Sequence, residues 1–489
     1  MFSRFKNKGN QTSKRSFDAA KMNRLVASWL SVTSSINAEL KEGIDALRTR
    51  ARDLELNEPM ARRYLSSVVA NVIGSRGVQL QARVTENGMQ DKLANAAIEA
   101  AWNRFGRIGV FDISGRMSRN DFERAVMKCV ARDGEALIIE HFGADNEFKY
   151  ALQLVDVNLI ATQKNLTLPN GNRVIMGVEI DGLGRPVAYH LYKSAFGDTS
   201  STVRETDRHS ADNIIHLFLA DSPEQVRGYS WMHASMIRMF HLKKYQEFAL
   251  VASAVGASKM GFFITPEGVA PPIADGEDET TGASYKEAAA GQFDVLPEGW
   301  DFRSFDPDYP HAMYGDFIKS AKRDIASGLN VSYNSLANDL EGVNFSSIRS
   351  GLLEEREQWM VYQDWFISCF EERIYANWMR SALLAKSIVL ENGNALPATK
   401  REKFMAHEFL ARRWPWVDPL KDEQAYNEAM KRGGASPYKI AAQKGEDAED
   451  ILDDIAKFLD YARAKNIPIE LITNQNADTD SLGGVRDVE

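Results

Sequence analysis

The chain of 489 residues is long enough for about three domains of ordinary size. Hydrophobic residues make up 44% and charged residues 26%, a composition typical of folded globular proteins, which excludes a wholly disordered chain. The net charge of −9 excludes a polycation that coats nucleic acid, and only two cysteines, Cys129 and Cys369, exclude a disulfide framework and favour a reducing compartment.

The two ends of the chain carry opposite charge. Residues 1–30 hold seven basic side chains and one acidic side chain, and they lack the apolar core of a secretory signal peptide, so export by that route is not expected. Residues 446–489 hold twelve acidic and four basic side chains, and the composition of 466–489 predicts disorder. For both ends, a solvated arm is a simpler interpretation than a dedicated binding tail.

Up to about residue 228 the pattern alternates helices with hairpins. Pro59 near a helix start and Gly74 and Gly77 near its end predict the first helix, and the turn sequence DGLG at 181–184 predicts a hairpin. The expected helices are at 57–77, around Ile98 to Phe105 and at 119–134, and the expected strands at 136–142, 150–155, 172–180 and 185–192. This order predicts an α+β region.

Helices dominate from Trp231 onward. A long helix from there to about Ser258 ends in a short strand, and a loop-rich stretch of Pro, Gly, Ser and acidic residues follows. A second helix ends at Gly328, and a third, very long helix begins near Asn344. The C-terminal third adds two or three helices, within 422–432, 437–444 and 446–465.

The most apolar run, residues 248–264, is 17 residues long and contains Lys259, so it falls short of a membrane-spanning helix. It is rich in Ala, Ser and Gly, which permit close helix approach. The small residues suit a ring of neighbouring copies and also suit ordinary packing within one subunit.

The sequence offers no recognisable catalytic or metal site. It contains no G-x-x-x-x-G-K-[ST] phosphate loop and no H-E-x-x-H motif. His233 and His241 are eight residues apart on one helix, too far to share a metal, and Ser230 lacks the second glycine of a nucleophile elbow. We therefore expect no catalytic residue, no metal and no cofactor, and this favours a structural or conduit role over an enzyme.

Five segments in the central plan carry a family resemblance. The most specific is DIASGLNVSYNSLANDLEGVNFSSIRSGLLEEREQW, at 324–359, where a Gly-Leu-x-Val-x-Tyr turn precedes an Asn-aromatic-Ser-Ser-x-Arg helix start. The others are NVIGSRGVQLQ at 71–81, GVEIDGLGRPVAYHLY at 177–192, IIHLFLADSPEQVRGYSWM at 214–232 and WPWVDPLKDEQA at 414–425. In this order they make the chain resemble the lambda-type portal proteins of tailed bacteriophages over most of residues 50–465.

The resemblance implies a homo-oligomeric ring, in this family typically a dodecamer, at one vertex of the capsid. Double-stranded DNA would pass through it during packaging and ejection. Implied partners are the terminase large subunit, the major capsid protein and the head-tail connector protein, with no membrane. The implied location is the virion, after assembly in the host cytoplasm.

The resemblance also implies a division of the chain into the parts of a portal subunit. These parts are an N-terminal arm and wing (1–228), a stem helix (229–258), a clip (259–308), a second stem helix (309–329), a tunnel loop (330–346), a long helix with wing return (347–417), a crown (418–465) and a disordered tail (466–489).

Two sets of site residues are expected from these assignments. The DNA channel would be lined by tunnel-loop residues Tyr333, Asn334, Asn338, Asp339, Glu341 and Asn344. Terminase or connector docking would use clip residues Pro266, Glu267, Asp275, Glu277 and Lys286. Polar, turn-forming residues suit a mobile loop that faces hydrated DNA, and a net-negative ring would let DNA slide rather than grip its phosphates.

Two other function classes can be compared with the sequence. A viral DNA-processing enzyme, such as a nuclease, would need clustered carboxylates with Lys to hold metal, and no such cluster stands out. The other class is a helical membrane-remodelling or scaffold protein. Membrane association would require a basic amphipathic helix, whereas the basic stretch at 4–24 is rich in Ser, Asn and Gln.

Overall fold

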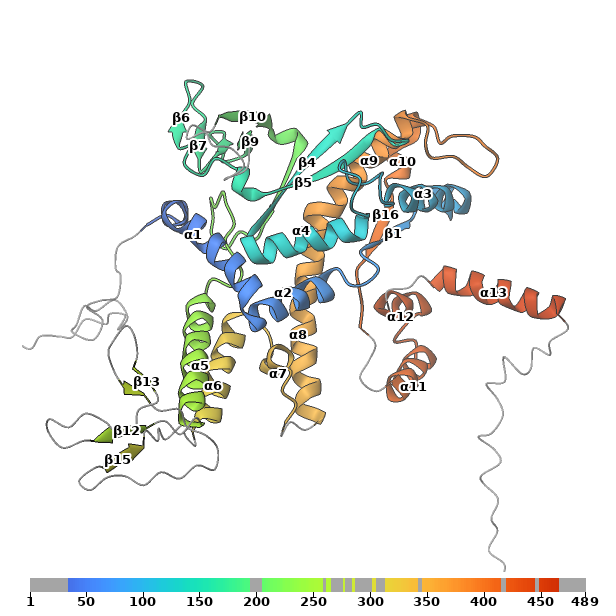
Figure 1. Cartoon of the computed structure of the whole chain (residues 1–489). Coiled ribbons are helices and arrows are strands. Elements are labelled where there is room, and N and C mark those ends of the chain that lie inside the picture. Colours follow the sequence, from blue (N-terminus) through green and yellow to red (C-terminus); the bar gives the residue numbers. More distant parts are fainter. Residues whose placement is uncertain are drawn as a thin grey trace, which may run out of the picture.

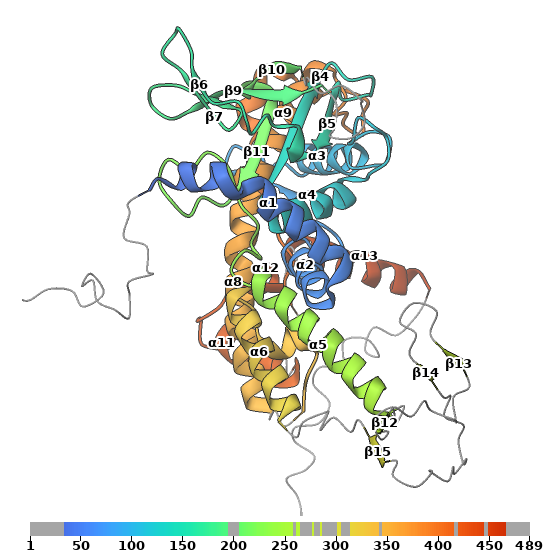
Figure 2. The same ribbon diagram turned by 60° about the vertical axis from the view of Figure 1, so that its left-hand side comes forward.

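The computed structural model confirms the α+β class (Figure 1). It describes residues 34–193, 205–257, 261–264, 276–277, 284–285, 301–304, 313–341, 345–414, 419–444 and 448–465. Helices and sheets form a body at one end, and a pair of helices, α5 and α6, extends away from it (Figures 1 and 2).

Local signals fix the helices of the body. Ser35 caps α1 (Ile36–Asn57), which the sequence analysis missed, and the side chain of Glu58 caps α2 (Pro59–Val72), whose first residue is proline. Asp91 caps α3 (Lys92–Phe105) and Ser118 caps α4 (Arg119–Asp133). Each cap satisfies a backbone N–H that has no partner inside its helix.

Antiparallel sheets complete the body. One has the order β11–β4–β5, with β11 at Ile214–Phe218, β4 at Glu135–Phe142 and β5 at Tyr150–Val155. A second has the order β10–β9–β8–β7–β6, with bounds Thr206–Ser210, Pro186–Tyr192, Val178–Ile180, Arg173–Ile175 and Leu166–Thr167. In two smaller pairs, β1 (Gln79–Ala82) joins β16 (His407–Leu410) and β2 (Thr85–Glu86) joins β3 (Met89–Gln90).

The prediction of a single strand at 172–180 is wrong. Met176 and Gly177 both have positive φ, 47° and 83°, so the chain turns there and forms β7 and β8 instead of one strand. A Cβ on Gly177 would lie 2.9 Å from the backbone of Ala161, which explains why glycine stands in this turn.

An aromatic cluster joins α3 and a helix of the C-terminal half of the chain in one core. Trp102 of α3 lies 4.9 Å, between ring centroids, from Trp378 of α9 (Glu372–Leu384), in an edge-to-face contact. Phe105 and Phe148 belong to the same cluster, with 5.6 Å between their ring centroids. Because these side chains are buried, the C-terminal half of the chain is an integral part of the body.

The very long helix expected after Asn344 is confirmed, with one interruption. It consists of α8 (Phe345–Phe366), a five-residue π-helix at Ile367–Glu371 and then α9. The π-helix turns Glu371 into the body, where it is fully buried against Glu123 of α4.

Two helices extend from the body side by side and meet a small pair of strands at their far end. They are α5 (Met236–Ala257) and α6 (Tyr314–Gly328), and Ser235 Oγ, just before α5, donates a hydrogen bond of 2.9 Å to the Ile325 carbonyl of α6. Beyond them β12 (Gly261–Ile264) pairs with β15 (Asp301–Ser304), and β13 (Gly276–Glu277) pairs with β14 (Ser284–Tyr285) (Figure 2).

The C-terminal helices expected from the sequence are present as α11 (Pro419–Lys431), α12 (Pro437–Lys444) and α13 (Ala448–Ala464). The remaining short helices are α7 (Tyr333–Ala337) and α10 (Arg401–Phe404), with 3-10 turns at Val157–Leu159, Ala211–Asn213 and Ala398–Lys400. Within the described residues, no helix has the length and apolar character needed to cross a membrane.

Candidate channel-lining segment

Most of the expected tunnel-loop residues lie between α6 and α8, in a segment that is partly helical (Figure 1). Ser332 Oγ accepts a hydrogen bond from the N–H of Ser335 and starts α7, and Asn338 ends it in the left-handed conformation with φ 52°. Tyr333 and Asn334 are therefore helical residues. Asp339 and Glu341 follow the helix, and Asn344 lies outside the described residues.

The helical half of the segment is anchored to the body. Glu355 Oε2 of α8 accepts hydrogen bonds from Ser332 Oγ at 2.8 Å and Ser335 Oγ at 3.0 Å. Arg63 of α2 donates to the carbonyl of Ser335 at 3.3 Å, and the side chain of Leu336 is buried in the main core. These contacts tie α7 to both α2 and α8, so its polar residues do not form a free loop.

The acidic pair at the end of the segment is partly neutralised. Lys319 Nζ of α6 lies 3.2 Å from Glu341 Oε2 and 3.9 Å from Asp339 Oδ2. Tyr333 donates its hydroxyl proton to Asp339 at 2.6 Å. The three charged side chains together carry −1, because one lysine offsets one of the two carboxylates.

These contacts change the pKa values of the groups. The hydrogen bond from Tyr333 lowers the pKa of Asp339, so this carboxylate stays charged at neutral pH. Burial, followed by the bond to Asp339, raises the pKa of Tyr333 to about 12, which keeps its hydroxyl a hydrogen-bond donor. The hydrogen bond to Glu341 raises the pKa of Lys319, so the ammonium group stays charged.

The partners that hold this segment are distant from it in sequence and were not predicted. Lys319 is 20 or more residues away from the two carboxylates in sequence, and Glu355 and Arg63 lie on two other helices. The capping pattern Ser332-x-x-Ser335 is the one local signal that could have indicated a helix here rather than a loop.

Most of the expected clip residues lie outside the described residues. These are Pro266, Glu267, Asp275 and Lys286. Glu277 is in strand β13, opposite Ser284 of β14. Their docking role stays a prediction.

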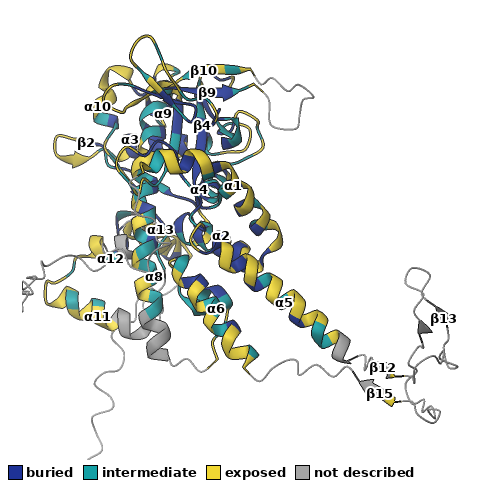
Figure 3. Cartoon of the chain, turned by 90° about the vertical axis from the view of Figure 1, so that its left-hand side faces the viewer, coloured by how far each residue is buried: buried dark blue, intermediate teal, exposed yellow. Residues whose placement is uncertain are grey.

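The helix pair α5 and α6 leaves many large apolar side chains exposed. Figure 3 shows how much of α5 is exposed, in yellow. Between them, Tyr245 packs against Phe317 at 5.1 Å between ring centroids. The exposed apolar side chains are Ile237, Phe240, Phe248, Leu250 and Val251 of α5, with Phe317 of α6 and Met313 just before it. An isolated subunit rarely exposes so many large apolar side chains on one pair of helices, so they indicate a protein partner.

No metal centre is found among the residues that the structure describes, since no three His, Cys, Asp or Glu side chains gather closely enough to hold an ion. The buried carboxyls of Glu123 and Glu371 face each other, and burial raises the pKa of both. Two adjacent acids with raised pKa values share a proton rather than hold a cation.

The chain is similar to a known protein family and to several curated proteins. The family model described as "Phage portal protein, lambda family" matches residues 22–363. A curated relative named "Probable portal protein", from Halomonas phage phiHAP-1, is 33% identical over 462 residues, covering 93% of this chain and 88% of its own length. "Portal protein B" of Escherichia phage lambda is 21% identical, covering 87% of this chain and 85% of its own length.

Solved structures with a similar chain include "Neck of empty GTA particle computed with C6 symmetry". It is 13% identical, with a TM-score of 0.44, and the match covers 86% of this chain and 97% of that one. "Neck of native GTA particle computed with C12 symmetry" has a TM-score of 0.41 at 12% identity, and the match covers 79% of this chain and 89% of that one.

Proposed function

The chain belongs to the lambda family of phage portal proteins, and from this premise we propose that it forms a homo-oligomeric ring of twelve copies at one vertex of the capsid. Double-stranded DNA enters the procapsid and leaves the virion through the ring. The terminase large subunit docks on it during packaging, the head-tail connector protein replaces the terminase, and the major capsid protein surrounds it.

The observation that carries the ring is the uncovered apolar surface on α5 and α6. Leu250 is 73% exposed and Phe248 is 68% exposed. Other apolar residues of the same helix are buried. Burying apolar surface contributes roughly 25 cal/mol per Å², so several such side chains supply a strong drive for association. A ring repeats one heterologous contact, which lets each copy cover its neighbour's surface.

The channel role rests on the segment after α7. A duplex that must slide needs a wall without a strong excess of cations, because bound phosphates release counterions and hold the duplex in place. Lys319, Asp339 and Glu341 together carry −1 per subunit. Arg323 lies 5.5 Å from the centroid of the Tyr333 ring, so a ring of such segments would carry charges of both signs and present no strong excess of cations.

The ring is tested by Val251→Glu with Leu250→Glu, which places two charges on the apolar surface without altering the core of the subunit. Leu183→Glu is the matched control, because Leu183 is also exposed but lies in the turn between β8 and β9. Sedimentation velocity and negative-stain microscopy should show rings for the native chain and the control and single subunits for the double variant. Single subunits for the native chain over a range of salt concentrations would contradict the proposal.

A further inference from the structure

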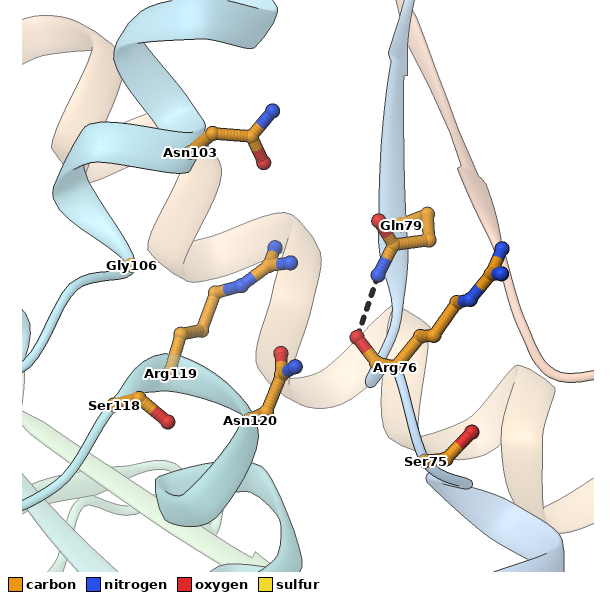
Figure 4. Close-up of a pocket in the computed structure, with 8 residues that line it drawn as sticks. All are labelled: Ser75, Arg76, Gln79, Asn103, Gly106, Ser118, Arg119 and Asn120. Carbon is orange, nitrogen blue, oxygen red and sulfur yellow. Dashed lines mark hydrogen bonds between the residues drawn. The ribbon is translucent and has the colours of Figure 1, made fainter.

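A polar pocket on the body is lined by a buried hydrogen-bond donor that has no partner among the described residues. It has a volume of about 370 Å³ and lies where the start of α4, the end of α3 and the chain leading into β1 meet (Figure 4). Arg76, Asn103, Arg119 and Asn120 line it, and no Asp or Glu is among the described residues that do so. The pocket is remote in sequence from the channel-lining segment.

The main donor is a buried guanidinium. Arg119 is 5% exposed, and its Nη1 atom has no hydrogen-bond partner among the described residues, although Nε lies 3.4 Å from Glu123 Oε1. Figure 4 shows this side chain rising from the start of α4 into the space between Asn103 and Gln79. An unpaired buried donor on a charged group costs free energy, which a bound anion would recover.

The other donors surround the same space from different directions. The amides of Asn103 on α3 and Asn120 on α4 and the exposed guanidinium of Arg76 also line this space. The first turn of α4 adds the positive end of a 15-residue helix. Gln79 is already engaged, because its amide donates to the Arg76 carbonyl at 2.6 Å.

We propose that this pocket binds a phosphate-class oxyanion, as free phosphate or as the phosphate group of a small molecule. A tetrahedral anion accepts from several directions at once, as the spread of donors over α3, α4 and the chain before β1 requires. Arg119 is buried, so a free phosphate or the phosphate group of a small molecule is the form of the anion that we assign to this pocket.

The test is titration calorimetry of the full-length protein with inorganic phosphate, at constant ionic strength set with sodium chloride. Phosphate should bind saturably and chloride should not compete. Arg119→Met should weaken binding about tenfold to a hundredfold, the loss expected for one charge-assisted contact. Arg107→Met is the matched control, because Arg107 is exposed in the turn after α3 and does not line the pocket.

A second variant keeps the test decisive if Arg119→Met fails to fold. Asn103→Asp alters an exposed residue and places a carboxylate beside Arg119, so it should abolish phosphate binding while the protein stays folded. Unchanged binding in Asn103→Asp, or no saturable binding by the native protein, would overturn the proposal. A 20-base-pair duplex should not displace phosphate; displacement would overturn the small-molecule assignment and identify a nucleic-acid site.

Discussion

Replacing Glu135 with Gln should destabilise the junction between the body and the α5–α6 pair. Glu135 is fully buried at the start of β4 and accepts hydrogen bonds from Arg227 at 2.5–3.1 Å, Arg48 at 2.8 Å and the N–H of Gly228 at 3.1 Å. The ring of His216 on β11 lies 2.9 Å from the same carboxylate. The carboxylate therefore links α1, two strands and the chain that leads into α5.

The expected loss in the free energy of unfolding follows from the buried guanidinium that the substitution leaves without a carboxylate. Gln keeps the shape of the side chain but removes the only carboxylate that faces the buried guanidinium of Arg227 within the described residues. Breaking one partner of a buried ion pair costs about 3–5 kcal/mol. Asp45→Asn is the control, because Asp45 contacts Arg48 at 3.5 Å from an exposed position, where such pairs contribute about 0–1 kcal/mol.

Urea unfolding followed by circular dichroism measures both variants, and the pH dependence adds a second check. The guanidinium of Arg227 holds the pKa of Glu135 well below its usual value despite burial. The contribution of the Glu135 carboxylate to the free energy of unfolding is thus present above the unfolded pKa of about 4.3 and is lost as the pH falls below it. The difference in free energy of unfolding between Glu135→Gln and the native protein should therefore become smaller below that pH. A loss no larger than that of Asp45→Asn at pH 7 would refute the reasoning.

Three further results are expected. Gly134→Ala should prevent soluble expression, because Gly134 has φ 91° and the added Cβ would lie 2.1 Å from the backbone of Tyr229; a normal yield and urea midpoint would contradict this. Burial and the neighbouring acid raise the pKa of Glu371, so the stabilisation by its protonated form is lost as the pH rises above the unfolded pKa of about 4.3. Glu371→Gln does not titrate, so the difference in urea midpoint between this variant and the native protein should shift in favour of the variant from pH 5 to pH 8. Asp339→Lys with Glu341→Lys changes the local charge from −1 to +3 per subunit and should slow packaging, measured as nuclease-protected DNA per procapsid, more at low salt than at high salt; equal packaging at low salt would exclude this segment from the channel wall.

The sequence predicted the elements whose signals are local. Pro59 and the glycines after residue 73 bound α2 closely, and the periodic apolar positions around Trp102 predicted α3. The helix α1 was missed because its buried positions include Arg48, a charged residue whose partner Glu135 is 87 residues away. The pairing of β1 with β16 was missed for the same reason, since no local pattern specifies a partner more than 300 residues distant.

The site residues show the same division between local and distant information. That Tyr333 to Glu341 form a polar connection between two helices could be predicted from composition alone. The charge of that connection could not, because Lys319 faces it from the preceding helix. Likewise, the pocket around Arg119 combines residues of three elements, and nothing in the order of the residues indicates that Arg119 Nη1 lacks a partner.

The anchoring of α7 restricts how the proposed channel-lining segment can move. Ser332 and Ser335 share one acceptor, Glu355, and Glu355 is part of the long helix that continues through the π-helix into the aromatic core of the body. A displacement of α7 would break both bonds or carry α8 with it. If the segment lines the channel as proposed, adjustment to DNA would come from Glu341, which is held by an exposed ion pair with Lys319 that costs little to break, rather than from Asp339, which also accepts the hydrogen bond of Tyr333.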